Sequence, residues 1–414
     1  MSTLTETYES RLAELTALQK QAQSYSTAVP VALGRQLLKA LRAVGDIEGN
    51  LYYPNLGRTG DALERYKEAI ATAQKIDSAD LQLEDSLELA AVHDGAGDLF
   101  GWTGNVVERL KNYFKSLEIR EKLSEANQDN PQLKRALMFS YSRIGDALAN
   151  KGKTGASQSY SLALQLAKEL APPNTTDAKA LEDLWICYLN IGESQLDSGD
   201  CEQALNSFSE CVKLVEQYAP SLPLDPDKCR NSLQGCRDLW ISYSKLADVQ
   251  LKLNRLDEAR QNYEQAKQIA QEIYNANEAN FQARCDLANA LDKMGYFMLA
   301  TGGVDDAETH YNDSLQHLQQ LATVDNTNMR NRHNLAQLHM NLAQVHEHRA
   351  NSQKISSSEQ KQHWQNAHSC YSASLEVWAS GEEGGSSYTV ARTACQKVRN
   401  IIEKLEARAG VLAG

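Results

Sequence analysis

Small and aromatic residues recur at fixed spacings along most of the chain. A small residue lies in an amphipathic stretch every 47 to 55 residues: Gly45, Gly97, Gly145, Gly192, Ala247, Gly295 and Ala343. The stretch that follows each of these carries one aromatic residue: Tyr66, Tyr113, Tyr160, Phe208, Tyr263, Tyr311 and Tyr371. Small residues usually stand four before and three after the aromatic, as Ala259 and Ala266 do around Tyr263. These offsets fall on one helical face, so each unit is predicted to be a pair of helices.

The same offsets predict that the two helices of a unit lie close together. A small residue lets the neighbouring helix approach, and the aromatic ring fills the remaining space. One such hairpin cannot bury its own apolar face, whereas stacked hairpins can. We therefore expect an all-α solenoid of hairpins joined by Gly- or Asn-containing turns. The expected repeats lie near 33–76, 84–125, 131–171, 178–219, 233–275, 281–322 and 329–380.

Amphipathic stretches at both ends predict capping helices. In the N-terminal segment, residues 1–32, one stripe is apolar: Leu4, Tyr8, Leu12, Leu15 and Leu18. The C-terminal segment, residues 381–414, has a similar stripe: Val390, Cys395, Val398, Ile401, Ile402 and Leu405. A solenoid needs such helices because its outermost hairpins would otherwise expose an apolar face. Between them, insertions at 221–232 and 350–362 lengthen two of the connections.

The paired stretches resemble the two helices of a tetratricopeptide repeat. The small–aromatic–small stretch is similar to the second helix of that repeat, and Tyr141 with Ile144 and Gly145 is similar to the first. The family unit has about 34 residues, whereas the spacing here is mostly 48, so we expect helices near 20 residues. The resemblance implies a right-handed superhelix of about seven hairpins whose concave groove binds a protein or peptide.

A narrower resemblance covers residues 44–70. This segment is similar to the opening repeat of the long-unit tetratricopeptide regions that follow the kinase domain in many bacterial serine/threonine kinases. The resemblance implies a bacterial signalling context. The kinase motifs themselves, a Gly-rich loop with a VAIK-type lysine, HRD and DFG, do not occur in the chain.

The charge and composition of the chain restrict the classes of partner that it can bind. The formal net charge is −12, which repels a phosphate backbone and favours a basic peptide over nucleic acid. The chain has no apolar stretch of membrane-spanning length and no secretion signal, so we expect a cytoplasmic protein that does not enter a membrane. The eight cysteines form no CxxC pair and are expected to be reduced thiols.

An acidic ladder is the candidate binding surface. Directly after the small position stand Asp46, Asp98, Asp146, Glu193 and Asp248. In the family this position commonly faces the groove, so these acids, with Asn190, Lys245 and Asn341, are the proposed contacts for a basic or amide-rich peptide. The alternative is that the acids pair within the protein. Arg143, Lys245 and Lys293 stand two residues before the small position and could each meet an acid on the next repeat.

Other candidates favour structural roles. Trp185 and Trp240 occupy equivalent places and are expected to pack between repeats, although exposed tryptophans can be binding hot spots. GAGDLFG at 95–101 is a weak match to a phosphate loop because no strand precedes it. The C-terminal histidines lack the spacing of a metal site: His333, His339, His346, His348, His363 and His368. We expect no metal, no cofactor and no catalytic constellation.

The sequence therefore predicts a non-catalytic interaction module, an adaptor or scaffold that binds a partner peptide or protein. Two alternatives remain open at this point. One is a scaffold that associates with itself. The other is a regulatory or sensor subunit that acts beside a kinase or another effector.

Overall fold

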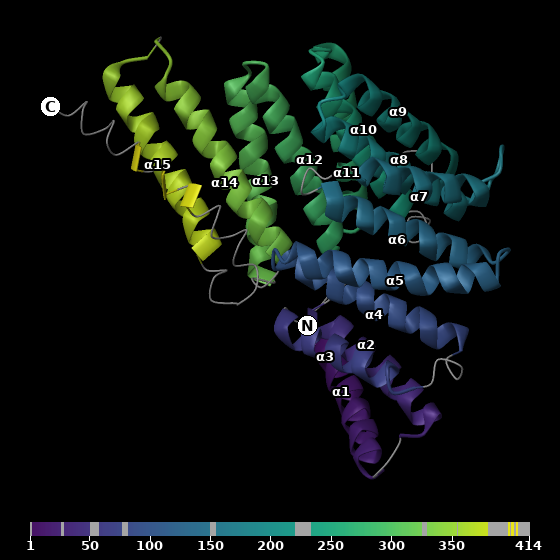
Figure 1. The fold of residues 1–414 in the computed structure, drawn as a ribbon. Helices are drawn as coiled ribbons and strands as arrows, with labels where there is room; N and C mark the ends of the chain where they lie inside the picture. Colours follow the sequence, from purple (N-terminus) through teal and green to yellow (C-terminus); the bar gives the residue numbers. More distant parts are fainter. Residues whose placement is uncertain are drawn as a thin grey trace. The chain divides into compact units, whose positions relative to one another are not determined.

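The computed structural model describes residues 2–25, 29–49, 58–76, 82–149, 155–219, 233–324, 329–353 and 355–379, with 396–397, 399–400 and 403–404. These residues form α-helices joined by turns and short connections, which confirms the predicted all-α fold (Figure 1). The chain divides into two compact units, residues 1–172 and 173–414. Each unit is a stack of helix hairpins.

The first unit contains one N-terminal helix and three hairpins. The pairs α2/α3, α4/α5 and α6/α7 form the hairpins, and α1 packs on α2. The helices are α1 (Ser2–Gln23), α2 (Val31–Gly49), α3 (Thr59–Ala73), α4 (Leu83–Trp102), α5 (Val106–Ala126), α6 (Pro131–Ala149) and α7 (Ala156–Leu170). Tyr8 and Leu15 of α1 are buried in one core with Leu38 and Leu41 of α2, so α1 covers the end of the stack as predicted.

The second unit contains four hairpins, α8/α9, α10/α11, α12/α13 and α14/α15. The helices are α8 (Ala178–Asp197), α9 (Cys201–Tyr218), α10 (Leu233–Lys252), α11 (Leu256–Ala276), α12 (Phe281–Ala300), α13 (Val304–Val324), α14 (Met329–Ala350) and α15 (Ser357–Ala379). Contacts also join the first helices α10, α12 and α14 to one another. The first helices of successive hairpins therefore line one side of the stack.

Each small residue of a first helix faces the aromatic ring of the same hairpin. A Cβ added to Gly145 would lie 2.5 Å from the Tyr160 ring, and one added to Gly192 would lie 2.6 Å from the Phe208 ring. Real Cβ atoms do not approach a ring this closely, so only glycine fits at this helix spacing. Tyr66 is also contacted from the next hairpin, because a Cβ on Gly95 would lie 2.8 Å from its ring. The predicted pairing of small and aromatic positions is confirmed.

The helix lengths and turns also agree with the sequence. The helices run from 15 to 23 residues, close to the expected 20. The turns hold Gly199 at φ 85° and Asn254 at φ 59°, a left-handed conformation that these residue types adopt most easily. The predicted linker 221–232 and nearly all of the predicted C-terminal cap, 381–414, lie outside the described residues. The 350–362 insertion forms the turn after α14 and the first residues of α15.

Candidate functional site

The acids of the ladder are held by the aromatic residues of their own hairpins. In four hairpins the tyrosine hydroxyl donates a hydrogen bond to the carboxylate that follows the small residue. The pairs are Tyr66–Asp46 at 2.6 Å, Tyr113–Asp98 at 2.5 Å, Tyr160–Asp146 at 2.7 Å and Tyr263–Asp248 at 2.6 Å. In the fourth hairpin the aromatic is Phe208, which has no hydroxyl, and the acid is the longer Glu193.

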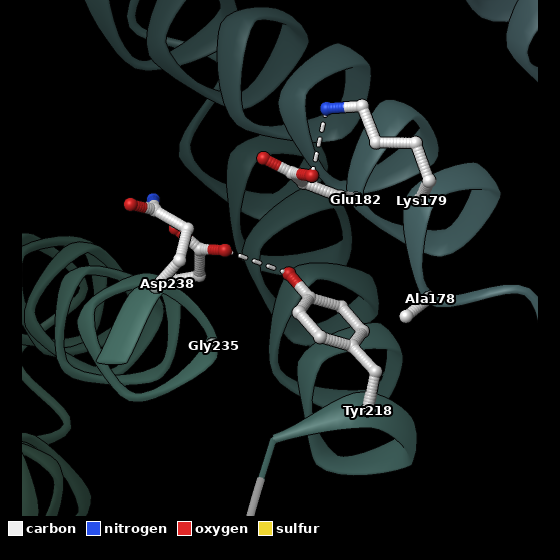
Figure 2. Close-up of a pocket in the computed structure, with 7 residues that line it drawn as sticks. Ala178, Lys179, Glu182, Tyr218, Gly235 and Asp238 are labelled. Atoms are coloured by element: carbon white, nitrogen blue, oxygen red, sulfur yellow. Dashed lines mark hydrogen bonds and ion pairs between the residues drawn. The ribbon is translucent and has the colours of Figure 1, made fainter. Parts of the chain in front are cut away.

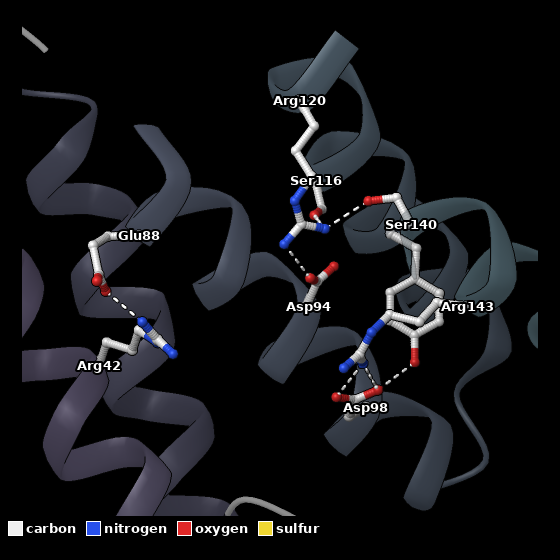
Figure 3. Close-up of polar contacts among 9 residues, drawn as sticks. Arg42, Glu88, Asp94, Asp98, Ser116, Arg120, Ser140 and Arg143 are labelled. Atoms are coloured by element: carbon white, nitrogen blue, oxygen red, sulfur yellow. Dashed lines mark hydrogen bonds and ion pairs between the residues drawn. The ribbon is translucent and has the colours of Figure 1, made fainter. Parts of the chain in front are cut away.

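A cation from the following hairpin contacts three of the ladder acids. Arg143 of α6 contacts both oxygens of Asp98 in α4 (Figure 3). In the second unit, Lys245 lies 2.5 Å from Glu193, and Lys293 lies 2.7 Å from Asp248. The pairing within the protein that the sequence left open is therefore present. Its direction is the reverse of the expected one, since each cation meets the acid of the preceding repeat.

These contacts reduce the free negative charge of the ladder. Burial raises the pKa of the Asp98 carboxyl, and Arg143 and Tyr113 oppose that shift. Burial works against the charge of Lys245, but Glu193, with Asp248 and Asp197, raises the pKa of Lys245 above its ordinary value. Asp98, Glu193 and Asp248 of the ladder are thus each paired with a cation from the following hairpin.

The candidate contacts of the second unit are polar, and some of their side chains are partly exposed. In the second unit the side chain of Glu193 is 45% exposed and that of Lys245 is 31% exposed. Asn341 of α14 donates to Asp292 of α12 at 2.7 Å, and Asn190 of α8 is half-buried. Asp46, Asp98 and Asp146 belong to the first unit and the other five candidates to the second.

A buried polar cluster in the first unit was not anticipated from the sequence. Arg120 of α5 lies 2.7 Å from Asp94 of α4 and donates to Ser116 and to Ser140 of α6 (Figure 3). Arg42 and Glu88 form a second pair between α2 and α4, at 2.6 Å. Both sets connect neighbouring hairpins, and neither has a regular sequence spacing that could have revealed it.

The second unit also has a polar cavity of about 310 Å³ between α8, the end of α9 and the start of α10. Glu182, Tyr218 and Asp238 point into it (Figure 2). The Tyr218 hydroxyl donates to Asp238 at 2.9 Å, and Gln234 donates to the other carboxylate oxygen at 2.8 Å. Burial, with Glu182 nearby, raises the pKa of Asp238 to about 6 despite these hydrogen bonds.

The tryptophans pack between hairpins, as expected. Trp185 is 6% exposed and Trp240 is 8% exposed. The Trp185 indole donates to Ser242 of the next hairpin at 2.8 Å. GAGDLFG is part of helix α4, and its glycines pack on side chains, which agrees with the expectation that it is not a phosphate loop.

The cysteine and histidine side chains pack against other side chains of the protein. Cys187, Cys211, Cys236 and Cys285 are buried, and burial raises the pKa of the Cys187 thiol to about 12. Such a thiol is protonated at neutral pH and is a poor nucleophile. The rings of His346 and His363 stack at 5.7 Å between α14 and α15. The described residues hold no group of three or more His, Cys, Asp or Glu side chains placed to bind a metal ion.

The architecture defines a helical-hairpin repeat protein. Residues 242–273, from the middle of α10 into α11, match the sequence profile of the tetratricopeptide repeat family. Residues 242–273 are therefore similar to a tetratricopeptide repeat, and they lie in one of the lengthened helix hairpins of the chain. None of the helices in the described part of the chain is both long and apolar enough to cross a membrane.

Three solved structures align with most of this chain. The apo form of the quorum sensor NprR from B. thuringiensis aligns over 98% of this chain and 99% of its own, with 13% identity and a TM-score of 0.51. A Rap protein in complex with competence and sporulation factor aligns over 99% of both chains, with 10% identity and a TM-score of 0.47. A STAND-type ATPase with a tetratricopeptide-repeat sensor, from Pyrococcus horikoshii, aligns over 90% of this chain and 46% of its own, with 14% identity and a TM-score of 0.48. A comparison with curated protein sequences finds no match.

Proposed function

We propose that the chain is a non-catalytic interaction module that binds a peptide or a segment of a partner protein along its first helices. The observation that carries this proposal is the row of ordered charge pairs, Glu193 with Lys245 and Asp248 with Lys293, on successive first helices of the second unit. An extended peptide presents donors and acceptors at regular intervals, and a preordered row of partners binds it with a smaller entropy loss. NprR, a bacterial quorum sensor, shares the fold, which is compatible with a bacterial signalling context.

The proposed contacts are the polar residues that the first helices carry near the small position. In the second unit the proposed contacts are Asn190, Glu193, Lys245, Asp248 and Asn341. In the first unit they are Asp46, Asp98 and Asp146. Because a tyrosine hydroxyl fixes most of these acids, the side chains are held in place before a ligand arrives. The partly exposed Glu193 and Lys245 are the residues from which we expect the largest effect on affinity.

The net charge of −12 favours a basic peptide. On the ladder such a peptide meets carboxylates that already hold a lysine or an arginine, so its basic groups compete with Arg143, Lys245 and Lys293. Affinity for a basic peptide would fall as salt is raised, because exposed charges are screened within about 8 Å at physiological ionic strength. If the affinity does not change with salt, a basic peptide is ruled out as the ligand and an amide-rich peptide is favoured.

Catalysis is not part of the proposal. Burial raises the pKa of the Cys187 thiol to about 12, and the ladder acids are engaged by tyrosine, lysine or arginine, so these groups offer neither an activated nucleophile nor a free general base. We propose that the protein works in the cytoplasm without a cofactor. A self-associating scaffold and a regulatory subunit beside a kinase are the alternatives that the test below separates.

The test is affinity capture from a lysate of the source organism with the intact chain, the double variant Lys245→Glu/Lys293→Glu, and a matched control. The control, Lys115→Glu/Lys213→Glu, makes the same charge change at lysines of second helices that are 58% and 65% exposed. A discrete partner that the ladder variant loses and the control keeps supports the proposal. A partner that both variants keep contradicts the ladder as the contact surface.

The same preparations decide between the alternatives. If the captured partner is a kinase, the regulatory-subunit alternative gains support. If no partner is retained and light scattering shows a concentration-dependent oligomer, the self-associating scaffold replaces the proposal. Circular dichroism of each variant checks that a lost partner does not reflect lost helix.

A further inference from the structure

The junction between α10 and α12 is closed by an arginine. Arg237 of α10 donates to both oxygens of Asp286 in α12, with Nε–Oδ2 at 2.5 Å and Nη2–Oδ1 at 3.3 Å. Gln282 donates a further hydrogen bond to Asp286 at 3.0 Å, and Asp286 is only 1% exposed. The buried carboxylate is thus neutralised by a guanidinium that reaches across from the preceding first helix. Arg35 of α2 pairs with the buried Asp85 of α4 in a similar way, at 2.8 Å.

The preceding junction, between α8 and α10, has the same carboxylate without the arginine. Asp238 stands nine residues before Ala247, as Asp286 stands before Gly295, and both are almost fully buried. Gln234 donates to Asp238 as Gln282 donates to Asp286. The equivalent of Arg237, ten residues before the small position, is Glu182. A second acid therefore stands where the next junction has its guanidinium.

The cavity of about 310 Å³ lies at this place, with Glu182, Asp238 and Tyr218 on its walls (Figure 2). Lys179 also lines it but is held by Glu182 at 2.8 Å, and its side chain is 49% exposed. The Tyr218 hydroxyl and Gln234 each donate one hydrogen bond to Asp238. A carboxylate can accept about four hydrogen bonds, so the two that Asp238 accepts leave it acceptor capacity, although it lines the cavity with 0% of its surface exposed.

We propose that this cavity binds the guanidinium group of an arginine side chain from a partner. The two carboxylates would share the planar donors of the guanidinium, which are arranged as a fork that matches carboxylate oxygens. The Arg237–Asp286 pair shows that this backbone arrangement accepts a guanidinium at the equivalent position. The inference concerns the N-terminal ends of α8 and α10 rather than the ladder, so it does not depend on the proposed function.

The test uses N-acetylarginine amide as the probe and N-acetylcitrulline amide as its uncharged counterpart, titrated by calorimetry into the full chain at neutral pH. The arginine probe should bind, and the citrulline probe should bind at least about tenfold more weakly, since it lacks the charge. The variant Glu182→Arg should no longer bind the probe and should melt at a higher temperature, because it reproduces the Arg237–Asp286 pair. The control Glu210→Arg changes an acid on α9 that is 43% exposed, and should keep the affinity.

Equal binding of the two probes, or unchanged binding by Glu182→Arg, would overturn the proposal. If Glu182→Arg does not fold, Glu182→Gln gives the same information through a loss of affinity. The chain's own Arg230, in the linker 221–232, is a second source of a guanidinium, and Lys228 beside it supplies an ammonium group. Binding that begins only after both are replaced by alanine assigns the cavity to the linker. No binding with or without them contradicts a guanidinium site.

Discussion

The hydroxyl of Tyr263 donates a 2.6 Å hydrogen bond to Asp248, and the same carboxylate lies 2.7 Å from Lys293 of the next hairpin. The aromatic residue of the repeat therefore has two roles. Its ring packs on the small residue of its own hairpin, and its hydroxyl orients the acid that meets the neighbouring hairpin. The tyrosine links the packing within a hairpin to the contact between hairpins.

Replacing Tyr263 with phenylalanine should lower stability while keeping the ring packing. We expect a loss of about 1.5–3 kcal/mol, because a buried hydrogen bond to a carboxylate is removed. The measurement is the urea midpoint of the full chain. Tyr243→Phe is the matched control, since its hydroxyl contacts Glu216 at an exposed site and its loss should cost less than about 0.5 kcal/mol. Equal effects of the two variants would contradict the role given to Tyr263.

Adding one methyl group to a small position should disrupt a hairpin. In Gly192→Ala the new Cβ would lie 2.6 Å from the Phe208 ring, so the helices must move apart, at a cost of about 1–3 kcal/mol. Gly60→Ala, in helix α3, is the control, because its Cβ would have none of the atoms of the neighbouring described residues within 4 Å. That change should be neutral or stabilise the protein by up to about 1 kcal/mol. Thermal melting of both variants checks the prediction, and a stable Gly192→Ala protein would refute it.

A serine at position 290 should stabilise the protein. Ser242 accepts the Trp185 indole hydrogen bond at 2.8 Å and donates to the Asp238 carbonyl at 2.7 Å. Ala290 stands at the equivalent place opposite Trp240, whose buried indole nitrogen has no hydrogen-bond partner in the described part of the chain. Ala290→Ser should therefore add about 0.5–1.5 kcal/mol, measured by urea denaturation.

The reverse change tests the same geometry. Ser242→Ala should remove about 1–3 kcal/mol, because it leaves the Trp185 indole buried without a partner. If Ala290→Ser destabilises the protein as much as Ser242→Ala does, the two tryptophans are not in equivalent surroundings. A crystal structure of Ala290→Ser would then show how the serine side chain is placed.

Stability should depend on pH through Asp238. Its pKa is raised from 3.8 to about 6 by burial, so the folded protein holds a proton that the unfolded chain releases between these values. This contribution to stability is complete below pH 3.8 and is lost as the pH rises through 6, and it amounts to at most about 3 kcal/mol. Tyr218 and Gln234 donate to Asp238, and Glu182 and Arg237 are the charges that face it.

The variant Asp238→Asn isolates this contribution. It cannot titrate, so its urea midpoint should change less than that of the parent protein between pH 4 and pH 7. Asp183→Asn is unsuitable as a control because Asp183 is also fully buried, whereas Asp257→Asn changes an exposed acid at the start of α11. An unaltered pH profile in Asp238→Asn would show that other groups cause the dependence.

The fold could be predicted from the sequence because its determinants are local and repeated. In five units a small residue is followed 15 or 16 residues later by an aromatic residue, as Gly145 is by Tyr160, and close packing of two helices requires that combination. The acids of the ladder recur too, but their hydrogen bonds depend on how two helices are rotated against each other. The spacing of Asp98 and Tyr113 alone does not reveal that rotation, nor that Arg143 reaches backward along the chain.

Single exceptions to the repeat were harder to interpret. In the sequence Glu182 resembles an ordinary surface acid. Its difference from the other units becomes clear only when α8 is superimposed on α10, because Arg237 then occupies the equivalent position. The border between the two compact units at Pro172–Pro173 is another case. The composition does not change there, which is why residues 33–380 read as one continuous array.

Because the contacts that join hairpins differ along the chain, the hairpins are not equally exchangeable. If α10 and α11 were deleted, Lys293 would face Glu193, and a lysine–acid pair would be restored at the ladder. At the N-terminal ends of the same helices, Glu182 would face Asp286 and the arginine between them would be gone. Loss of this repeat by recombination would therefore keep the ladder contact, but it would bring two acids together at the N-terminal ends of the remaining helices.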